Sequence, residues 1–379
     1  MFVPLGIYIH FPFCIHRCVY CDFNVFLDEG PKAHATFIDL LEKEISHQSK
    51  RYSSRFKVDT IYCGGGTPSL FSPPLIQRVL NCLSDQFQLT QTCEITLEAN
   101  PNSLNRENLE GFLKSGINRL SIGIQSLTQK HLKTLERSHT AQEALEAIAL
   151  AQTVGFRNIN LDFIFGIPGQ TLLEWQETLL KAFSLNPQHL STYHLTVPPR
   201  NRLFEQLPSD GLGKAMYQWA VRELPTQGFR HYEVSAFSQT GMECKHNLKY
   251  WKLENYLGLG PGADSYLITP EWPFGCHLSN IRNLKQYETA ILTQNGALAE
   301  SEILNQDQAQ RDYLLTHFRL MEGISFQAFQ DRFHLSFEDR YQKILQSLQE
   351  KMMVDIHKQM LKLTPKGLLY LNQVLIDFM

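Results

Sequence analysis

The chain has 379 residues, of which 43% are hydrophobic and 19% are charged, and its formal net charge at pH 7 is -3. This composition is typical of a globular protein with a large core, and it excludes a disordered or low-complexity chain. The small negative charge provides no basic field for a nucleic acid, so we expect no nucleic-acid partner.

The first predicted element is a short apolar strand near the N-terminus. Residues 1–6 contain neither a charged region nor a long apolar stretch, so they do not have the pattern of a signal peptide. No candidate transmembrane segment follows, and we therefore expect a cytoplasmic protein. In that compartment the eight cysteines are expected to be reduced and available for metal or redox chemistry.

Short apolar runs alternate with amphipathic helical patterns between residue 5 and about residue 195. This alternation predicts an α/β fold with six strand-helix units and a parallel sheet. We expect strands at 5–10, 58–63, 94–99, 119–124, 158–164 and 189–195. We expect helices at 32–49, 74–85, 106–115, 141–154 and 171–184. In such a sheet, ligand sites gather at the carboxyl ends of the strands.

The repeating pattern loosens after residue 196, where a Val-Pro-Pro sequence interrupts it. Because the chain is too long for one ordinary core, we expect three domains. The first spans 1–196, the second is an irregular α+β extension at 197–299, and the third is a small helical, winged-helix-like domain at 300–379.

Three cysteines follow the first predicted strand in a CxxxCxxC pattern: Cys14, Cys18 and Cys21. Three thiolates can each bind one iron of a four-iron cubane, which leaves the fourth iron without a protein ligand. A zinc ion bound by these thiols together with His10 or His16 is the alternative, because three cysteines and one histidine form a common tetrahedral set. Covalent haem attachment is excluded, because it needs a histidine directly after a CxxC pair and this chain has an aspartate there.

The cysteine segment resembles the cluster loop of the radical S-adenosylmethionine (SAM) superfamily, and in particular that of its anaerobic coproporphyrinogen dehydrogenase-like branch. The resemblance continues over nearly the whole chain. It implies a partial (β/α)6 radical SAM barrel, a [4Fe-4S] cluster held by the three cysteines, and SAM bound at the fourth iron.

A glycine-rich turn follows the second predicted strand, with the sequence CGGGTPS at 63–69. Three consecutive glycines indicate backbone that a ligand approaches closely, although a simple strand-end turn has the same composition. The resemblance implies that Gly65, Gly66 and Thr67 contact the amine and carboxylate of SAM. Further residues that it places at this site are the strand-end side chains Glu98, Gln125 and Asp162, the carboxylate partner Arg137, and the flanking rings Tyr8 and Tyr20. Each of these residues, taken singly, is equally consistent with a solvated polar side chain.

One position separates two groups within this branch. The coproporphyrinogen dehydrogenases carry a further cysteine two positions after the third cluster ligand, whereas this chain has Phe23 there. The chain also contains the HNxxYW motif of the branch's haem chaperones, formed by His246, Asn247, Tyr250 and Trp251. A histidine can supply an axial imidazole to haem iron, and aromatic rings can pack on a porphyrin. A packed loop with a hydrogen-bonded histidine is the alternative.

The resemblance implies a haem chaperone on a radical SAM scaffold, which delivers haem to haem-requiring membrane or respiratory proteins. It further implies a cluster-dependent homodimer and peripheral contact with the membrane. The alternatives are an oxygen-independent coproporphyrinogen III dehydrogenase of porphyrin biosynthesis and another radical SAM enzyme. Asp264 stands where most relatives are expected to have a histidine, which argues against a second haem ligand of that kind.

Overall fold

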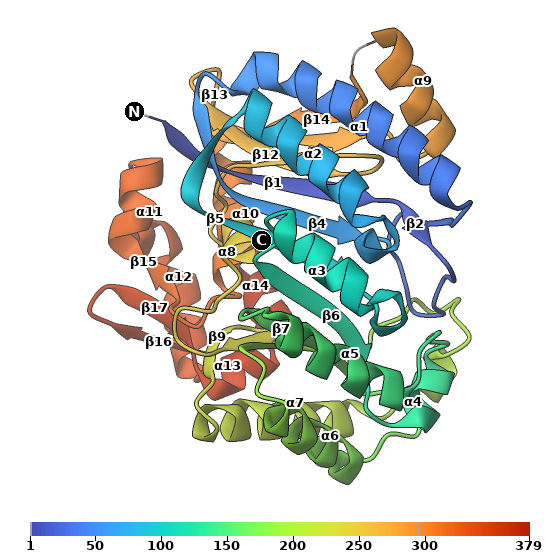
Figure 1. Cartoon of the computed structure of the whole chain (residues 1–379). Helices are drawn as coiled ribbons and strands as arrows, with labels where there is room; N and C mark the ends of the chain where they lie inside the picture. Colours follow the sequence, from blue (N-terminus) through green and yellow to red (C-terminus); the bar gives the residue numbers. More distant parts are fainter. Residues whose placement is uncertain (1, 295) are drawn as a thin grey trace.

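The computed structural model of the chain describes residues 2–294 and 296–379. Its central feature is one sheet, in which the described residues form 12 strands (Figure 1). Six of them run parallel in chain order, as the sequence predicts: β1 (Val3–Phe11), β4 (Phe56–Gly65), β5 (Gln88–Ala99), β6 (Arg119–Gln125), β7 (Ile159–Phe165) and β8 (His189–His194). The sheet is open, because its two edges, β14 (Leu298–Ile303) and β9 (Arg230–Glu233), do not pair with each other. The prediction of a partial barrel is confirmed.

Amphipathic helices cover the outer face of this sheet (Figure 1): α1 (Pro31–Tyr52), α2 (Pro73–Gln86), α3 (Arg106–Lys114), α5 (Ala141–Val154) and α6 (Leu172–Ser184). Their apolar faces pack on the strands and form the main core. Two of them begin in capping boxes, where Thr140 or Thr171 and the glutamate three residues later satisfy the first backbone amides. The sequence did not predict α4 (Gln129–Thr134), because six residues are too few to establish a helical period.

The middle region extends both edges of the main sheet. Beside β1 lies β11 (Tyr256–Leu259), which is parallel to it, followed by the antiparallel strands β12 (Asp264–Thr269), β13 (Trp272–Asn280) and β14. Beside β8 lies the antiparallel strand β10 (Ala236–Ser238), followed by β9. The helices of this region are α7 (Asp210–Thr226), α8 (Lys245–Trp251) and α9 (Leu284–Gln294). This α+β region therefore shares a sheet with the first predicted domain, and the boundaries at 196 and 299 stay a prediction.

The C-terminal residues form a second core on the side of the sheet where the parallel strands begin (Figure 1). Phe329, Phe333 and Phe337 lie at its centre. Its helices are α10 (Gln306–His317), α11 (Phe326–Phe333), α12 (Phe337–Glu350), α13 (Pro365–Leu369) and α14 (Leu371–Phe378). A small antiparallel sheet joins them, in the order β15 (Ile324–Ser325), β17 (Met360–Leu363) and β16 (Val354–His357). No helix in the described ranges has both the length and the apolar composition that crossing a membrane requires.

The carboxyl ends of the parallel strands lie at the opposite side from the C-terminal module (Figure 1). The short parallel pair β2 (Phe13–Cys14) and β3 (Phe26–Leu27) lies there. The described residues also form the 3₁₀ turns η1 (Pro68–Leu70), η2 (Pro101–Ser103) and η3 (Phe204–Gln206). The loop between β2 and β3 carries the second and third cysteines of the motif, so the cysteines lie where the fold is expected to bind ligands.

Candidate functional site

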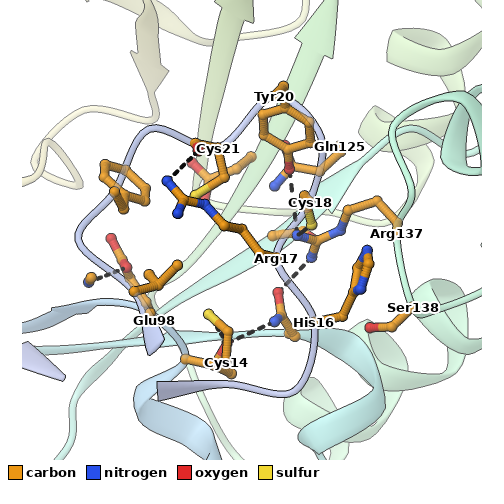
Figure 2. A pocket seen from close by; sticks show the side chains of 18 of the residues that line it. Cys14, His16, Arg17, Cys18, Tyr20, Cys21, Glu98, Gln125, Arg137 and Ser138 are labelled. Atoms are coloured by element: carbon orange, nitrogen blue, oxygen red, sulfur yellow. Dashed lines mark hydrogen bonds between the residues drawn. The ribbon is translucent and has the colours of Figure 1, made fainter. Parts of the chain in front are cut away.

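A cavity of about 360 Å³ lies at the carboxyl ends of the parallel strands. The cysteine loop arches over it, and the Arg137 side chain reaches toward that loop (Figure 2). The predicted cluster and SAM residues that line the cavity are Cys14, Cys18, Tyr20, Cys21, Gly65, Gly66, Thr67, Glu98, Gln125, Arg137 and Asp162. Tyr8 is the one predicted cluster or SAM residue that does not line this cavity.

Backbone hydrogen bonds close the cysteine loop at its base. The amide of Phe26 donates to the carbonyl of Pro12 at 2.8 Å, and the amide of Asp28 donates to the carbonyl of Cys14 at 2.9 Å. The pairing of β2 with β3 results from these contacts. A closed base keeps the loop compact and holds its thiols above the strand ends.

The three motif thiols are free and partly exposed. The Cys14 sulfur lies 3.4 Å from the hydroxyl of Thr67, and the Arg137 guanidinium donates to the Cys18 sulfur at 3.5 Å. Burial raises the pKa of the Cys14 and Cys21 thiols. Because a thiolate is the form that binds metal, iron in this loop would displace the thiol protons.

A four-iron cluster and a single zinc ion place different demands on the positions of the thiols. Within residues 2–294 and 296–379, no three histidine, cysteine, aspartate or glutamate side chains are arranged to hold one metal ion. A zinc site needs that convergence on one point, whereas each thiolate of a cubane binds a different iron. His10, one of the alternative zinc ligands, is engaged elsewhere, since its Nε2 donates to the carbonyl of Asn24 at 2.7 Å.

The glycine-rich turn lies directly against the cysteine loop. The amide of Gly66 donates to the carbonyl of Phe11 at 2.7 Å, and the amide of Thr67 donates to the carbonyl of Phe13 at 2.8 Å. A Cβ atom on Gly66 would lie 2.5 Å from the carbonyl oxygen of Phe13, and Gly65 has a φ of +105°. Only glycine fits these two positions without strain, and the turn and the cysteine loop form one unit.

Two partly buried carboxyl groups face the cavity. Glu98 accepts a hydrogen bond from the Tyr62 hydroxyl at 2.8 Å and another from the Gly65 amide at 3.1 Å, and burial raises its pKa to about 7. Asp162 accepts a hydrogen bond from the Ser121 hydroxyl at 2.8 Å, and burial raises its pKa as well. A positively charged ligand favours the ionised form of such groups, so this pair suits the ammonium and sulfonium of SAM.

Arg137 connects the strand ends to the cysteine loop. Its guanidinium donates to the Asn100 side chain at 2.5 Å, to the Gly123 carbonyl at 2.9 Å and to the Tyr20 hydroxyl at 3.4 Å. Together with its contact to Cys18, these bonds fix the guanidinium at the cavity wall. Its role as the partner of the SAM carboxylate stays a prediction.

Among the lining residues that sequence reasoning missed, Tyr62 and Asn100 hydrogen-bond to predicted site residues. Tyr62 donates to Glu98, and Asn100 donates to the hydroxyl of Thr67 at 3.0 Å while it accepts from Arg137. Residues two positions apart on a strand point to the same face, so Tyr62 lies on the same inner face of β4 as Gly64 in the glycine-rich turn. This alternation is the sequence signal that could have identified Tyr62. Asn100 follows the last residue of β5 and could have been found by the same rule that identified Glu98.

Tyr8 lies in a second cavity, of about 300 Å³, that is located between the cysteine loop and α8. Its hydroxyl is 3.0 Å from Nδ1 of His10. The ring of Tyr62, whose centroid is 6.2 Å from that of Tyr8, lines the first cavity in its place. Phe23 lines both cavities.

The histidine of the HNxxYW motif is enclosed in the protein. His246 is completely buried, and its ring is stacked on that of Tyr62 with centroids 5.2 Å apart. Its Nδ1 is 2.8 Å from the Thr60 hydroxyl, and its Nε2 is 2.9 Å from the Tyr250 hydroxyl. Burial lowers its pKa to about 3. In this structure neither ring nitrogen is free to bind iron, and the axial-ligand role of His246 stays a prediction.

The other motif residues have separate environments. Tyr250 lines the second cavity, whereas Asn247 and Trp251 line neither cavity. The guanidinium of Arg319 packs over the ring of Trp251 at 5.0 Å from its centroid. Of the four motif residues, Tyr250 alone lines one of these two cavities.

Replacing Glu98 with glutamine is expected to flatten the dependence of stability on pH. The folded-state pKa of Glu98 is raised to about 7, so between its ordinary pKa and pH 7 the folded protein binds more protons than the unfolded chain. The free energy of unfolding therefore falls as the pH rises through this range, by about 3 kcal/mol at most from this group. Urea denaturation of the metal-free protein at pH 5 and pH 8 measures this fall.

The exposed Glu177, on α6, provides the matched control, because Glu177→Gln should leave the decrease between pH 5 and pH 8 unchanged. An equal decrease in wild type and Glu98→Gln would contradict the assignment of this proton to Glu98.

Comparison with known proteins gives two family matches. Residues 8–182 match the family described as the radical SAM superfamily, and residues 304–370 match the HemN C-terminal domain. The chain is 35% identical over 323 residues to the heme chaperone HemW of Escherichia coli (strain K12), which covers 84% of this chain and 83% of the relative. It is 31% identical over 383 residues to the heme chaperone HemW of Lactococcus lactis, which covers 99% and 97% of the two chains.

The fold is also similar to a solved structure over its whole length. The coproporphyrinogen III oxidase HemN of Escherichia coli, a radical SAM enzyme, superposes with a TM-score of 0.87 at 25% sequence identity. The superposition covers 100% of this chain and 90% of that one. The chain therefore belongs to the radical SAM superfamily and, within it, to the coproporphyrinogen III oxidase-like family that includes the HemW proteins.

Proposed function

We propose that the chain is a haem chaperone that holds a [4Fe-4S] cluster and SAM in the first cavity. The observation that carries this proposal is the 35% identity to the heme chaperone HemW over more than four fifths of both chains. Two features of the chain agree with it: the HNxxYW motif on α8, and Phe23 at the position where a coproporphyrinogen dehydrogenase is expected to have a cysteine.

The residues of the first cavity have separate tasks in this proposal. Cys14, Cys18 and Cys21 would hold the cluster and would leave one of its irons open to SAM. A reduced cluster of this kind supplies an electron to the sulfonium of SAM. The glycine-rich turn brings backbone amides close to the cysteine loop, and Glu98 presents a carboxylate to the positive charge of SAM. These tasks use groups that line one cavity.

The proposed carrier function also involves a location in the cell, proteins that accept haem, and a second copy of the chain. We propose that the protein works in the cytoplasm, associates peripherally with the membrane, and transfers haem to haem-requiring membrane or respiratory proteins. We further propose that it forms a homodimer when the cluster is present. The described residues contain no helix suited to crossing a membrane, so the proposed membrane contact uses the surface of the fold.

Haem titration of the cluster-loaded protein tests the carrier function. A Soret band that saturates at a fixed ratio of haem to protein is expected for wild type. His246→Ala should weaken binding, because it removes the support of Tyr250, the motif residue that lines the second cavity. His47→Ala, at a partly exposed position on α1, is the control and should bind haem like wild type. Failure of wild type to bind haem specifically would refute the proposal.

The likeness to HemN over the whole chain favours a second candidate, the oxidative decarboxylation of coproporphyrinogen III. An anaerobic assay with reductant and SAM separates the two functions. Formation of protoporphyrinogen at a catalytic rate would favour the dehydrogenase, whereas haem binding without turnover favours the chaperone. Phe23 argues against the dehydrogenase, because it replaces the further cysteine expected in those enzymes.

A further inference from the structure

A chain of side-chain hydrogen bonds connects the sulfur of Cys18 to the sulfur of Cys14. The Arg137 guanidinium donates to the Cys18 sulfur at 3.5 Å, and its other terminal nitrogen donates to the Oδ1 of Asn100 (Figure 2). The Nδ2 of Asn100 donates to the Thr67 hydroxyl at 3.0 Å, and that hydroxyl is 3.4 Å from the Cys14 sulfur. We call this set of contacts the cysteine relay. All of its members line the first cavity.

The direction of each hydrogen bond in the relay is fixed by Arg137. A guanidinium has donors and no acceptor, so the Asn100 oxygen must face it and the Asn100 amide nitrogen must face Thr67. The Thr67 hydroxyl accepts from that nitrogen, so its own proton is free to point to Cys14. A thiolate that binds iron can only accept, which agrees with this direction. One guanidinium therefore directs a donor to each of the two sulfurs.

The surrounding residues hold Asn100 and Arg137 in place. The backbone amide of Asn100 donates to the Ser69 hydroxyl at 3.3 Å, and its carbonyl accepts from the Ser103 hydroxyl at 2.7 Å. Arg137 also donates to the carbonyl of Gly123 at 2.9 Å. A Cβ atom on Gly123 would lie 3.3 Å from the guanidinium and 3.4 Å from the Asn100 oxygen, so a larger residue there would crowd the pair. The relay is therefore built into the fold.

We infer that the cysteine relay raises the reduction potential of the cluster, and that Asn100 is its positioning residue. This inference rests on the four-iron cluster of the proposed function. Hydrogen bonds to the sulfurs are among the features that set the potential of an iron-sulfur cluster. Reduction adds one negative charge, so donors at the sulfurs stabilise the reduced form more than the oxidised form. The relay thus makes the cluster easier to reduce and weakens its drive to pass the electron to the sulfonium of SAM.

Replacing Thr67 with valine tests the relay at Cys14. Valine has nearly the same shape but no hydroxyl, so the Cys14 sulfur loses its donor while the three cysteines remain. In an anaerobic redox titration without SAM, followed by electron paramagnetic resonance, the potential should fall by about 59 mV, which corresponds to about tenfold in the equilibrium constant for a one-electron reduction. Thr67→Ser keeps the hydroxyl and should stay near the wild-type potential.

Thr196→Val is the matched control for this loss of a hydroxyl. Thr196 also lines the first cavity, but its hydroxyl donates to the carbonyl of His194 and has no contact with the relay. The potential of this variant should equal that of wild type.

Replacing Asn100 with aspartate tests the direction of the relay. The carboxylate keeps its contact with Arg137, but its second oxygen can only accept, so the Thr67 hydroxyl turns its proton from Cys14 to the carboxylate. The potential should fall at least as far as in Thr67→Val. The double variant with Thr67→Val and Asn100→Asp has no hydroxyl to turn, so its fall should be smaller than the sum of the two single falls. This comparison separates the relay from the added negative charge.

The results distinguish failure of the relay from failure of the cluster, because iron and sulfide are measured on each sample. A wild-type potential in Thr67→Val, or falls that add fully in the double variant, would overturn the relay and leave the cluster proposal in place. Should Thr67→Val not assemble the cluster, Asn100→Asp decides alone, since an unchanged potential in that variant also overturns the relay. Wild type that assembles no iron-sulfur cluster would refute both proposals.

Discussion

Replacing Cys18 with alanine is expected to leave the chain without a stable four-iron cluster. Only three protein ligands are available, so the loss of one thiolate leaves two iron corners open instead of one. The variant also removes one of the four hydrogen-bond partners of the Arg137 guanidinium. After anaerobic reconstitution we expect roughly tenfold less iron and sulfide per chain than in wild type.

A matched variant separates the loss of a cluster ligand from the loss of any thiol. Cys82, on α2, is a partly buried cysteine outside the cavity, and Cys82→Ala should assemble the cluster like wild type. A full iron and sulfide content in Cys18→Ala, with unchanged absorbance, would show that Cys18 is not a ligand.

Replacing Gly66 with alanine is expected to damage both the SAM site and the fold around it. The new methyl group would lie 2.5 Å from the carbonyl oxygen of Phe13 and 2.9 Å from that of Phe11, and both are backbone atoms that cannot rotate away. Relief of this overlap requires the turn to move away from the cysteine loop, which breaks the hydrogen bond from the Gly66 amide. We expect a loss of about 2 kcal/mol in the free energy of unfolding. We also expect a fall in SAM affinity of about tenfold or more.

Chemical denaturation and SAM titration of the reconstituted protein measure the two effects. Gly211→Ala on α7 is the control, because a methyl group there would meet the nearest atom, the Ser209 hydroxyl oxygen, at 3.9 Å. It should leave SAM affinity unchanged. Wild-type stability and wild-type SAM affinity in Gly66→Ala would mean that the turn has a different geometry.

The parallel core of the fold could be predicted because its signals are local. The six predicted strands are short apolar runs, and the five helices predicted between them are long enough to show their period. The strands of the middle region were not predicted individually, and some of them find their partners far away in the chain. β11, for example, pairs with β1 across about 250 residues, and no local pattern encodes that pairing.

The sequence predicts those site residues that belong to a recognisable motif or lie at the end of a predicted strand. The cysteines, the glycine-rich turn, Glu98 and Asp162 all line one cavity, since the carboxyl ends of parallel strands converge. The position of Tyr8 was not predictable in the same way. It lies in the middle of β1 and not at a strand end, and the ring of Tyr62, with its centroid 6.2 Å away, lines the first cavity instead.

The environment of His246 also depends on contacts that the sequence does not encode locally. The motif suggested an available imidazole, but Thr60 on β4 and Tyr250 on α8 occupy its two nitrogens. Only the packing of α8 against β4 brings Thr60 and His246 together. The phenols of Tyr250 and Tyr256, which do reach a cavity, were less conspicuous in the sequence than the histidine.

The central claim is that three cysteines hold a cubane whose fourth iron is open to SAM. Electron paramagnetic resonance of the reduced, anaerobically prepared protein, with iron and sulfide measured on the same sample, tests it most directly. We predict about four iron and four sulfide per chain and a signal that changes when SAM is added. Stoichiometric zinc without iron or sulfide, or a cluster signal that SAM leaves unchanged, would contradict the claim.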